Sequence, residues 1–553
     1  MTLLFKGLRR IGWAVPVASA ALSGSALAAA VPSFSAASRL SLALSAVPGA
    51  RECPTAALIE LSRTAPAQVQ SLLGSAPVLL REQIWIDPAT RTAYHFTVSP
   101  ESPDAVPAAD RDGSGVPDQI EVIAGAMREA WASGAAAGLT RRPGAKETPR
   151  AVWLADLGGE AAGYAIALPA AMPYAVIDPT PADEQSLRDE AAHLAAHLLL
   201  FERTTAGPGG WHEATATWLE VSARRDAGRH AAAAARLLRE PERGLFASIL
   251  QDGRSGWIWA AFLSESAAPG TAPVAGIWEA LADNPALSLG EATSAALAVG
   301  GRSLRDAFVQ FNYWNLFTGS RDDGRHYSFG FLLPEPAPAA SHDRYPALSI
   351  GTGRPIGAYG ASTIRLEPDG GPGGVTVSVE TEPGPGWEIE LLVAAPHLPR
   401  VWRRVPVRLD EKGRGTVRAP WDDAAEMILM VRRPSLDAPA SRLSYVVTPD
   451  EAFPFELTSL AAEPEAGQIR LVWETESERD LVGWQVLRAT GRGPLLPVEG
   501  IMVPALGTED GPVSYQFVDD GVTAGAVYRY RIVGVTIEGL TQRSFIVTAR
   551  AGR

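Results

Sequence analysis

The stretch EAAHLAAH at residues 190–197 continues directly into the apolar run LLLF at residues 198–201. Alanine and leucine favour a helix, and a helix that is apolar on every side is typically buried. His193 and His197 are four residues apart, which places them about 40° apart around a helix axis, so both imidazoles point in the same direction. The stretch therefore predicts a buried helix with a pair of imidazoles on one face.

A second helix is predicted directly downstream. The sequence GPGG at residues 207–210 interrupts the first helix, and WHEATATWLE at residues 211–220 begins a new one. Its Glu213 completes a set of two helical histidines and a glutamate on the next helix, which is the ligand set of the gluzincin class of zinc peptidases. The alternative is structural, because histidines on a buried helix also satisfy their polarity by hydrogen bonds to the backbone or to Glu190.

The motif lacks one residue that peptidase chemistry needs. The zinc-peptidase signature is H-E-x-x-H, whose glutamate is the general base, and here Leu194 occupies that position. A leucine can neither accept nor return a proton, and loss of a general base costs on the order of 10²–10⁴ in rate. Glu190 lies one turn before His193, where three roles are open to it: orienting His193, acting as an additional ligand, or serving as a substitute base. Zinc binding itself does not need the missing glutamate.

The sequence DRDGSGVPDQIE at residues 110–121 has the register of a twelve-residue calcium loop. Such a loop places oxygen ligands at positions 1, 3, 5, 7, 9 and 12 and a glycine at position 6, which is Gly115 here. Pro117 at position 8 departs from the usual apolar residue. The alternative is an acidic turn that caps the helix predicted at residues 119–137. The predicted calcium ligands are the side chains of Asp110, Asp112, Ser114, Asp118 and Glu121 and the backbone carbonyl of Val116.

The N-terminus has the three parts of a secretory signal peptide. Basic residues in the first ten positions are followed by an apolar stretch at residues 11–30, and ALA at residues 26–28 is a small-x-small cleavage motif. We therefore predict a signal peptide at residues 1–28 and an exported protein that is periplasmic, on the cell surface or secreted. A membrane anchor at the same place is the alternative. Cys53 is the only cysteine, so an intramolecular disulfide is excluded.

Composition limits the function classes. The chain has 553 residues, of which 46% are apolar and 20% are charged, which suits several folded domains. Its formal net charge of −13 argues against a nucleic-acid partner, because such a partner needs a broad basic surface. No run beyond the N-terminus reaches the ~18 apolar residues of a spanning helix, so we expect no transmembrane segment in the mature chain.

Four segments are expected after the signal peptide. A leader occupies residues 29–79, flexible at first and helical in short pieces after residue 51. An α+β domain follows at residues 80–345, and its predicted strands lie at 83–86, 92–98, 152–154 and 174–177, with mostly helices between 180 and 317. Two all-β sandwich domains are expected at residues 346–450 and 454–550.

The last segment resembles a fibronectin type III domain. It has alternating strand segments, a core Trp473, and a tyrosine-corner-like Tyr within residues 527–532. In the preceding sandwich, Trp387 and Trp402 are candidates for stacking on sugars, although core packing is the commoner use of tryptophan. An extracellular protein or a polysaccharide is therefore the expected partner of the sandwich domains.

The order of the motifs in residues 80–345 resembles a family of exported bacterial zinc metalloproteases of the gluzincin type. That family has an Asp/Gly calcium-type loop ending in Pro-Asp, a strand, an H-E-x-x-H helix, a helix that opens with Glu and ends in Trp-x-Glu, and a closing helix and turn similar to FNYWNLFTG at residues 311–319. The resemblance implies a zincin-like fold with His193, His197 and Glu213 as zinc ligands. The other matching residues are Asp110 to Glu121, Tyr174 to Asp178, Trp218 and Glu220.

These observations lead to one expectation and one alternative. The expectation is an exported zincin-like metalloprotease homologue that is catalytically degenerate because of Leu194, and that acts as a metal-stabilised binding or scaffold protein with zinc and calcium as its ions. The alternative is an active zinc metallopeptidase that uses another base such as Glu190.

Overall fold

The computed structural model consists of two compact units. The first contains the residues up to Glu121 and Thr148–Glu184, and the second contains Val122–Glu147 and Gln185–Arg553. The predicted signal peptide at residues 1–28 lies outside the described residues. The structure describes residues 35–44, 53–140, 150–159, 161–168, 172–180, 183–268, 271–349, 353–368, 373–383, 386–395, 398–507 and 511–552.

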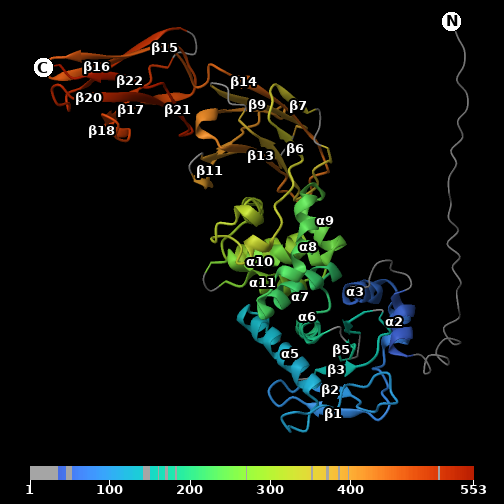
Figure 1. Ribbon diagram of the computed structural model, residues 1–553. Coiled ribbons are helices and arrows are strands. Elements are labelled where there is room, and N and C mark those ends of the chain that lie inside the picture. The colour runs from blue at the N-terminus through green and yellow to red at the C-terminus, as the bar shows by residue number, and fades with distance from the viewer. Residues whose placement is uncertain are drawn as a thin grey trace, which may run out of the picture. The chain divides into compact units, whose positions relative to one another are not determined.

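The first unit is built on a five-stranded sheet with the strand order β1-β2-β3-β5-β4. Figure 1 labels β1, β2, β3 and β5 of this sheet. The pairs β2–β3 and β3–β5 are parallel, whereas the outer pairs β1–β2 and β4–β5 are antiparallel. All residues of β4 and β5 are buried, which fits their continuous apolar sequences. The strands are β1 (Gln83–Ile86), β2 (Ala93–Phe96), β3 (Ala151–Leu154), β4 (Gly163–Ile166) and β5 (Tyr174–Ile177).

Three short helices pack on one face of this sheet: α2 (Ala36–Leu44), α3 (Thr55–Thr64) and α4 (Pro66–Leu73). Their leucines form one apolar core with alternate residues of β3, β4 and β5, as the period of a strand requires. The Thr55 hydroxyl oxygen accepts a 2.9 Å hydrogen bond from the backbone N–H of Ala165, so α3 covers the edge strand β4. The segment expected to be a leader is therefore largely part of the folded unit.

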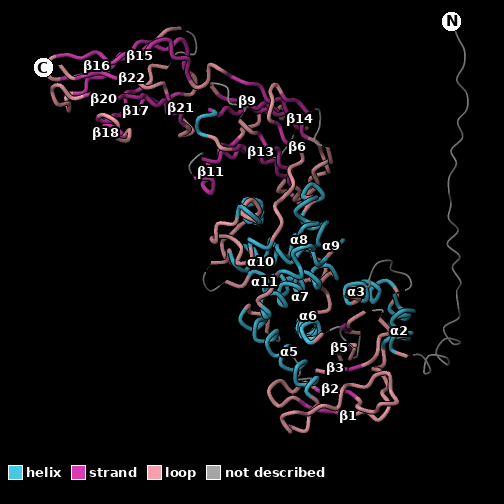
Figure 2. Tube along the Cα trace, in the orientation of Figure 1, coloured by secondary structure: helices cyan, strands magenta, loops and turns pink. Residues whose placement is uncertain are grey.

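The second unit begins with helices and continues into strands, as Figure 2 shows. Every residue of α6 from Asp189 to Phe201 and of α7 from Gly209 to Val221 is buried. The indole N–H of Trp131 donates to the carbonyl of Ala195 at 2.9 Å, which ties α5 to α6. The main helices are α5 (Asp118–Ala136), α6 (Glu184–Arg203), α7 (Gly209–Arg224), α8 (Gly228–Arg239), α9 (Leu245–Gln251), α10 (Trp257–Glu265), α11 (Pro273–Asp283), α12 (Leu289–Val299) and α13 (Leu304–Trp314).

Two sheets form the first β-sandwich of this unit, with the strand orders β11-β10-β13-β8-β6 and β12-β9-β14-β7. Its core consists of alternate valines, leucines and isoleucines from both sheets. The first of its strands begins at Ala340, a few residues before the expected boundary. The strands are β6 (Ala340–His342), β7 (Ala347–Ser349), β8 (Ala361–Leu366), β9 (Gly374–Thr381), β10 (Glu388–Ala395), β11 (Leu398–Pro406), β12 (Arg414–Pro420), β13 (Glu426–Arg432) and β14 (Leu443–Asp450).

The first sandwich also packs against the helical part. Leu316 and Phe317, which follow α13, form an apolar cluster with Trp402 and neighbouring residues of β10 and β13. Trp402 is thus a core residue, and the guanidinium of Arg433 lies 4.6 Å from the ring centre of the half-buried Trp387. Neither tryptophan forms the exposed platform that stacking on a sugar requires, and both pack against a core, which is the commoner use of tryptophan.

The second β-sandwich has the strand orders β15-β16-β19 and β18-β17-β20-β21, and β22 pairs with β20. Trp473 is buried in its core, and the hydroxyl oxygen of Tyr528 accepts a 2.8 Å hydrogen bond from the N–H of Thr523, as in a tyrosine corner. The domain is therefore fibronectin type III-like, as expected. Its strands are β15 (Phe455–Glu465), β16 (Gln468–Glu478), β17 (Leu481–Thr490), β18 (Leu496–Pro504), β19 (Val513–Asp519), β20 (Val527–Thr536), β21 (Thr541–Arg543) and β22 (Val547–Arg550).

Within the described parts of the chain, no helix combines the length and the apolar character that crossing a bilayer requires.

Candidate metal centre

Helix α6 places two imidazoles side by side in the interior of the second unit. His193 and His197 are both buried, and their Nε2 atoms lie 3.2 Å apart. The i, i+4 spacing accounts for the common direction, and the apolar residues around them account for the burial. The structure thus brings the two predicted ligands together, as their spacing implied.

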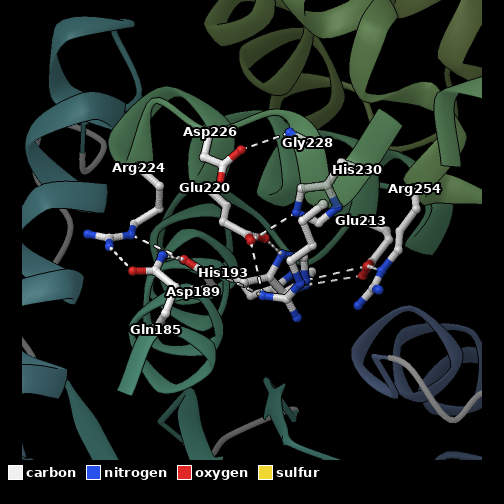
Figure 3. Close-up of polar contacts among 12 residues, drawn as sticks. Gln185, Asp189, His193, Glu213, Glu220, Arg224, Asp226, Gly228, His230 and Arg254 are labelled. Atoms are coloured by element: carbon white, nitrogen blue, oxygen red, sulfur yellow. Dashed lines mark hydrogen bonds and ion pairs between the residues drawn. The ribbon is translucent and has the colours of Figure 1, made fainter. Parts of the chain in front are cut away.

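Helix α7 adds the third predicted ligand. One carboxylate oxygen of Glu213 lies 3.4 Å from Nε2 of His193, and the other lies 3.4 Å from Nε2 of His197. Burial by itself raises the pKa of Glu213, but the two imidazoles outweigh it and hold this pKa well below its ordinary value. The carboxylate is therefore ionised and faces both imidazoles. Figure 3 labels Glu213 and His193 of this group.

The spacing of the three side chains fits a zinc ion. Two atoms bound to a tetrahedral zinc ion at about 2.0–2.2 Å lie about 3.3–3.6 Å from each other. The three observed separations of 3.2, 3.4 and 3.4 Å are close to these values. Oε2 of Glu213 is buried, and its 3.4 Å contact with Nε2 of His197 does not meet the geometry of a hydrogen bond. A cation held by the three side chains would satisfy this oxygen.

A second carboxylate orients the first imidazole. Glu220, two turns after Glu213 on α7, accepts a 3.1 Å hydrogen bond at Oε2 from Nδ1 of His193 and a 2.9 Å bond at Oε1 from Nε2 of His230 on α8. Burial raises the pKa of Glu220, but the bonds from His193 and His230 outweigh it and lower the pKa to about 2. With Nδ1 donating to this carboxylate, Nε2 of His193 is the nitrogen that faces Glu213, and loss of its proton would free it to bind a metal ion.

An arginine contacts the carboxylate of Glu213 from the other side. Nε of Arg254 lies 2.8 Å from Oε1 of Glu213, and the arginine side chain is 14% exposed (Figure 3). Arg254 belongs to the short 3₁₀ turn η3 (Gly253–Gly256). A Cβ on Gly253 would lie 2.5 Å from Cβ of Glu213, so only glycine lets this turn approach α7 so closely.

The two residues that bear on catalysis lie on α6. Leu194, at the position of the missing base, is fully buried. Glu190 is buried too, and among the described residues its Oε1 has no hydrogen-bond partner. Burial raises the pKa of Glu190 despite the neighbouring charges of His193 and Arg229. One role considered for Glu190 was to orient His193. In the structure Glu220 contacts Nδ1 of His193 and has this role instead.

The predicted calcium loop lies in the first unit. Asp110 accepts hydrogen bonds from the N–H groups of Ser114 (3.0 Å) and Gly115 (2.9 Å), and Gly115 has the positive φ of 83° that position 6 requires. Asp112 also accepts from Ser114 at 3.0 Å, and Asp118 accepts from the N–H of Arg111 at 2.9 Å.

These bonds close the loop on itself. Among the described residues, convergent ligand atoms of the kind seen around His193 are not found in this loop. Calcium at Asp110, Asp112, Ser114, Val116, Asp118 and Glu121 stays a prediction.

Sequence reasoning assigned no role to three residues of the centre. Glu220 lies seven residues after Glu213, which is two helical turns and therefore the same face, so its proximity was open to prediction. His230 and Arg254 come from other elements, and no periodic pattern connects them to α6 and α7. Their placement depends on how α8 and η3 pack against α7.

Comparison with known proteins adds no assignment. No protein-family model matches the chain, and no curated protein shows significant similarity to it. Among solved structures, it is similar to pectate lyase PelI from Erwinia chrysanthemi (21% identity, 17% of this chain, 28% of that chain, TM-score 0.14). It is also similar to an Fn3-like protein from Clostridium thermocellum (19% identity, 18% of this chain, 96% of that chain, TM-score 0.14). A third structure, the FN1–FN3 domains of chicken CNTN1, has 13% identity, 33% and 66% coverage and a TM-score of 0.17.

Proposed function

We propose that this chain is an extracytoplasmic, zincin-like metal-binding protein that has lost peptidase chemistry. The three-way convergence of His193, His197 and Glu213 at 3.2–3.4 Å carries the proposal. Support for export comes from the signal-peptide pattern at residues 1–28, and the two β-sandwiches suit binding to an extracellular protein or polysaccharide.

Zinc is the ion that the donor set favours. Two imidazoles and one carboxylate are the protein ligands of many zinc sites, and a fourth position is then open to another ligand. A zinc ion bound there would supply Lewis acidity toward a carbonyl oxygen. The chain's own residues fix the ligands: Glu220 holds the His193 tautomer, and the packing of α6 against α7 holds Glu213. At Leu194 no group accepts or returns a proton, so binding is retained and hydrolysis is lost.

Zinc titration of the purified mature chain tests this proposal. After EDTA treatment, the wild-type protein should take up one tightly bound equivalent against a chromophoric chelator, and His193→Gln, His197→Gln and Glu213→Gln should each lose it. His326→Gln is the matched control, because its imidazole stacks on Phe317 outside this centre. Cys53→Ser is a second control, because a cysteine thiol is itself a zinc ligand and could contribute to the zinc uptake. Wild-type uptake no better than that of the ligand variants would refute the site.

A second candidate function is an active peptidase that uses Glu190. The buried position of Glu190, its unpaired oxygen and its raised pKa favour this candidate, because a base near neutrality needs such a shift. Zinc-dependent cleavage of unfolded casein by the wild-type chain, abolished by Glu190→Gln with zinc still bound, would establish it over the first candidate.

A further inference from the structure

Arg254 is an unusual neighbour for a metal ligand. A cationic side chain next to a cation site repels the ion, and it also draws charge from the carboxylate that both would share. The contact nevertheless depends on a glycine, because a Cβ at position 253 would lie 2.5 Å from Cβ of Glu213. Gly256 is the second glycine of the turn, and a Cβ at this position would lie 3.2 Å from Cβ of Ala214 on α7. The turn is thus shaped to bring an arginine to this carboxylate.

We propose that Arg254 is a positioning residue that competes with the metal ion for Glu213, so that the site exchanges its metal instead of holding it permanently. The inference rests on the proposed metal-binding function. A buried carboxylate needs a counter-charge, and the 2.8 Å contact from Arg254 adds one to the contacts from His193 and His197. A metal ion that binds Glu213 must therefore offset the contact that Arg254 makes with the same carboxylate.

Two consequences follow from this competition. Replacing Arg254 by a neutral side chain removes the repulsion and leaves Glu213 poorly compensated in the metal-free state. Both effects favour the metal-bound state, so the affinity for zinc should rise while the metal-free protein loses stability. A residue with a merely structural role gives the opposite pattern, because a loosened site binds its metal less tightly.

The experiment compares zinc affinity and thermal stability in four full-length proteins. Arg254→Met should bind zinc at least tenfold more tightly than wild type and release it more slowly to a chelator. Its melting temperature in EDTA should fall, and the increase on adding zinc should be larger. Arg254→Lys keeps the charge and should stay near wild type, while Arg254→Gln replaces Arg254→Met if the latter does not fold.

Arg224→Met is the matched control. Arg224 is similarly buried, with 15% of its side chain exposed, and it pairs with Asp189 and Glu129 away from the three ligands. Its loss should lower stability without changing zinc affinity. If wild type binds zinc but Arg254→Met binds it equally or more weakly, the competition is refuted and the metal site stands. If neither wild type nor Arg254→Met binds zinc, the proposed function itself fails.

Discussion

Leu194 follows His193 directly on α6, and its side chain is fully buried. We predict that the wild-type chain shows no peptidase activity above background on unfolded casein. Leu194→Glu restores the proton-accepting group at the position of the signature, so it should create hydrolysis that chelators abolish. The expected gain lies on the order of 10²–10⁴-fold over wild type, measured as initial rates with zinc present.

Leu194→Gln is the control for this gain, because it has nearly the same size and polarity but no basic carboxylate. Activity in both variants would mean that the change acts through packing. An inactive Leu194→Glu with zinc bound would mean that the surroundings of the site no longer accommodate a substrate.

Glu220 acts on the centre through His193. Glu220→Gln removes the charge that fixes the imidazole tautomer, and loss of such a partner typically costs 10–100-fold in metal affinity. We therefore expect zinc binding to weaken by that factor, and the ¹⁵N resonances of His193 in the metal-free protein to show a changed tautomer. Glu242→Gln is a suitable control, since Glu242 is also buried but bonds to Ser362 instead. Unchanged affinity in Glu220→Gln would contradict the role.

Glu390 gives the first sandwich a predictable acid sensitivity. Burial raises the pKa of this carboxyl, but the fully buried Arg432 and the neighbouring Arg404 outweigh it and hold the pKa below its ordinary value of 4.5. Because the folded-state pKa is lowered, the stability that Glu390 contributes is complete above pH ~4.5 and is lost as the pH falls toward the folded value.

The measurement is the urea midpoint of wild type and Glu390→Gln from pH 7 to pH 3. The variant leaves the buried Arg432 with only the longer 3.8 Å contact to Glu388, so at pH 7 it should lose about 3 kcal/mol. The difference between the two proteins should shrink toward pH 3. Glu456→Gln, an exposed residue of β15, should show no such convergence. A constant difference over the whole range would rule out the ionic contribution.

At the scale of elements, the loop at residues 110–121 carries the calcium prediction. Calcium should raise the melting temperature, because hydrogen bonds within the loop already hold the loop's oxygen ligands in one register. Asp112→Ala should abolish the increase in scans with and without EDTA. Asp410→Ala is the control: Asp410 accepts the N–H groups of Lys412 (2.9 Å) and Arg414 (2.8 Å) in a similar exposed turn that lacks the loop's further oxygens. If EDTA leaves the melting temperature of the calcium-loaded protein unchanged, the calcium prediction is wrong.

The sequence was informative where one period governs a whole element. The 3.6-residue period and burial of α6 were readable from EAAHLAAH, and so was the common direction of His193 and His197. Strand β4 was missed, because its Gly163 and Ala165 are weak strand formers, whereas the equally short β1 and β5 contain isoleucine and valine. Helix α2 was missed as well, since a short Ala/Ser-rich segment resembles a leader until its leucines pack on a sheet.

The environment of the candidate site was less accessible to prediction. The contacts of Arg254 and His230 with Glu213 and Glu220 depend on the packing of η3 and α8 against α7, and such packing leaves no signature in the local sequence. The same holds for Trp402, whose neighbours come from the residues after α13. Residue type alone does not distinguish a buried tryptophan from a binding platform.

At the scale of the whole molecule, the two sandwiches are joined by more than a linker. Leu540, between β20 and β21 of the second sandwich, is fully buried in the apolar core of the first. The N–H of Arg543 donates to Asp422 at 3.0 Å, and Arg418 pairs with Asp480 at 3.4 Å across the same junction. A side chain of one domain thus completes the core of the other, and this couples their stabilities.

Leu540→Ala tests the coupling. Truncating a fully buried leucine typically costs 2–5 kcal/mol of stability. Here the first sandwich should lose this stability, although Leu540 belongs to the second sandwich in sequence. We expect hydrogen exchange to accelerate in β9 and β14 of the first sandwich. Leu471→Ala is matched in burial but lies in the core of the second sandwich, so it should accelerate exchange in β16 and β19 instead. If Leu540→Ala leaves β9 and β14 as protected as in wild type, the two sandwiches are independent domains. Binding of a partner to the second sandwich would then not be coupled through the first sandwich to the metal centre.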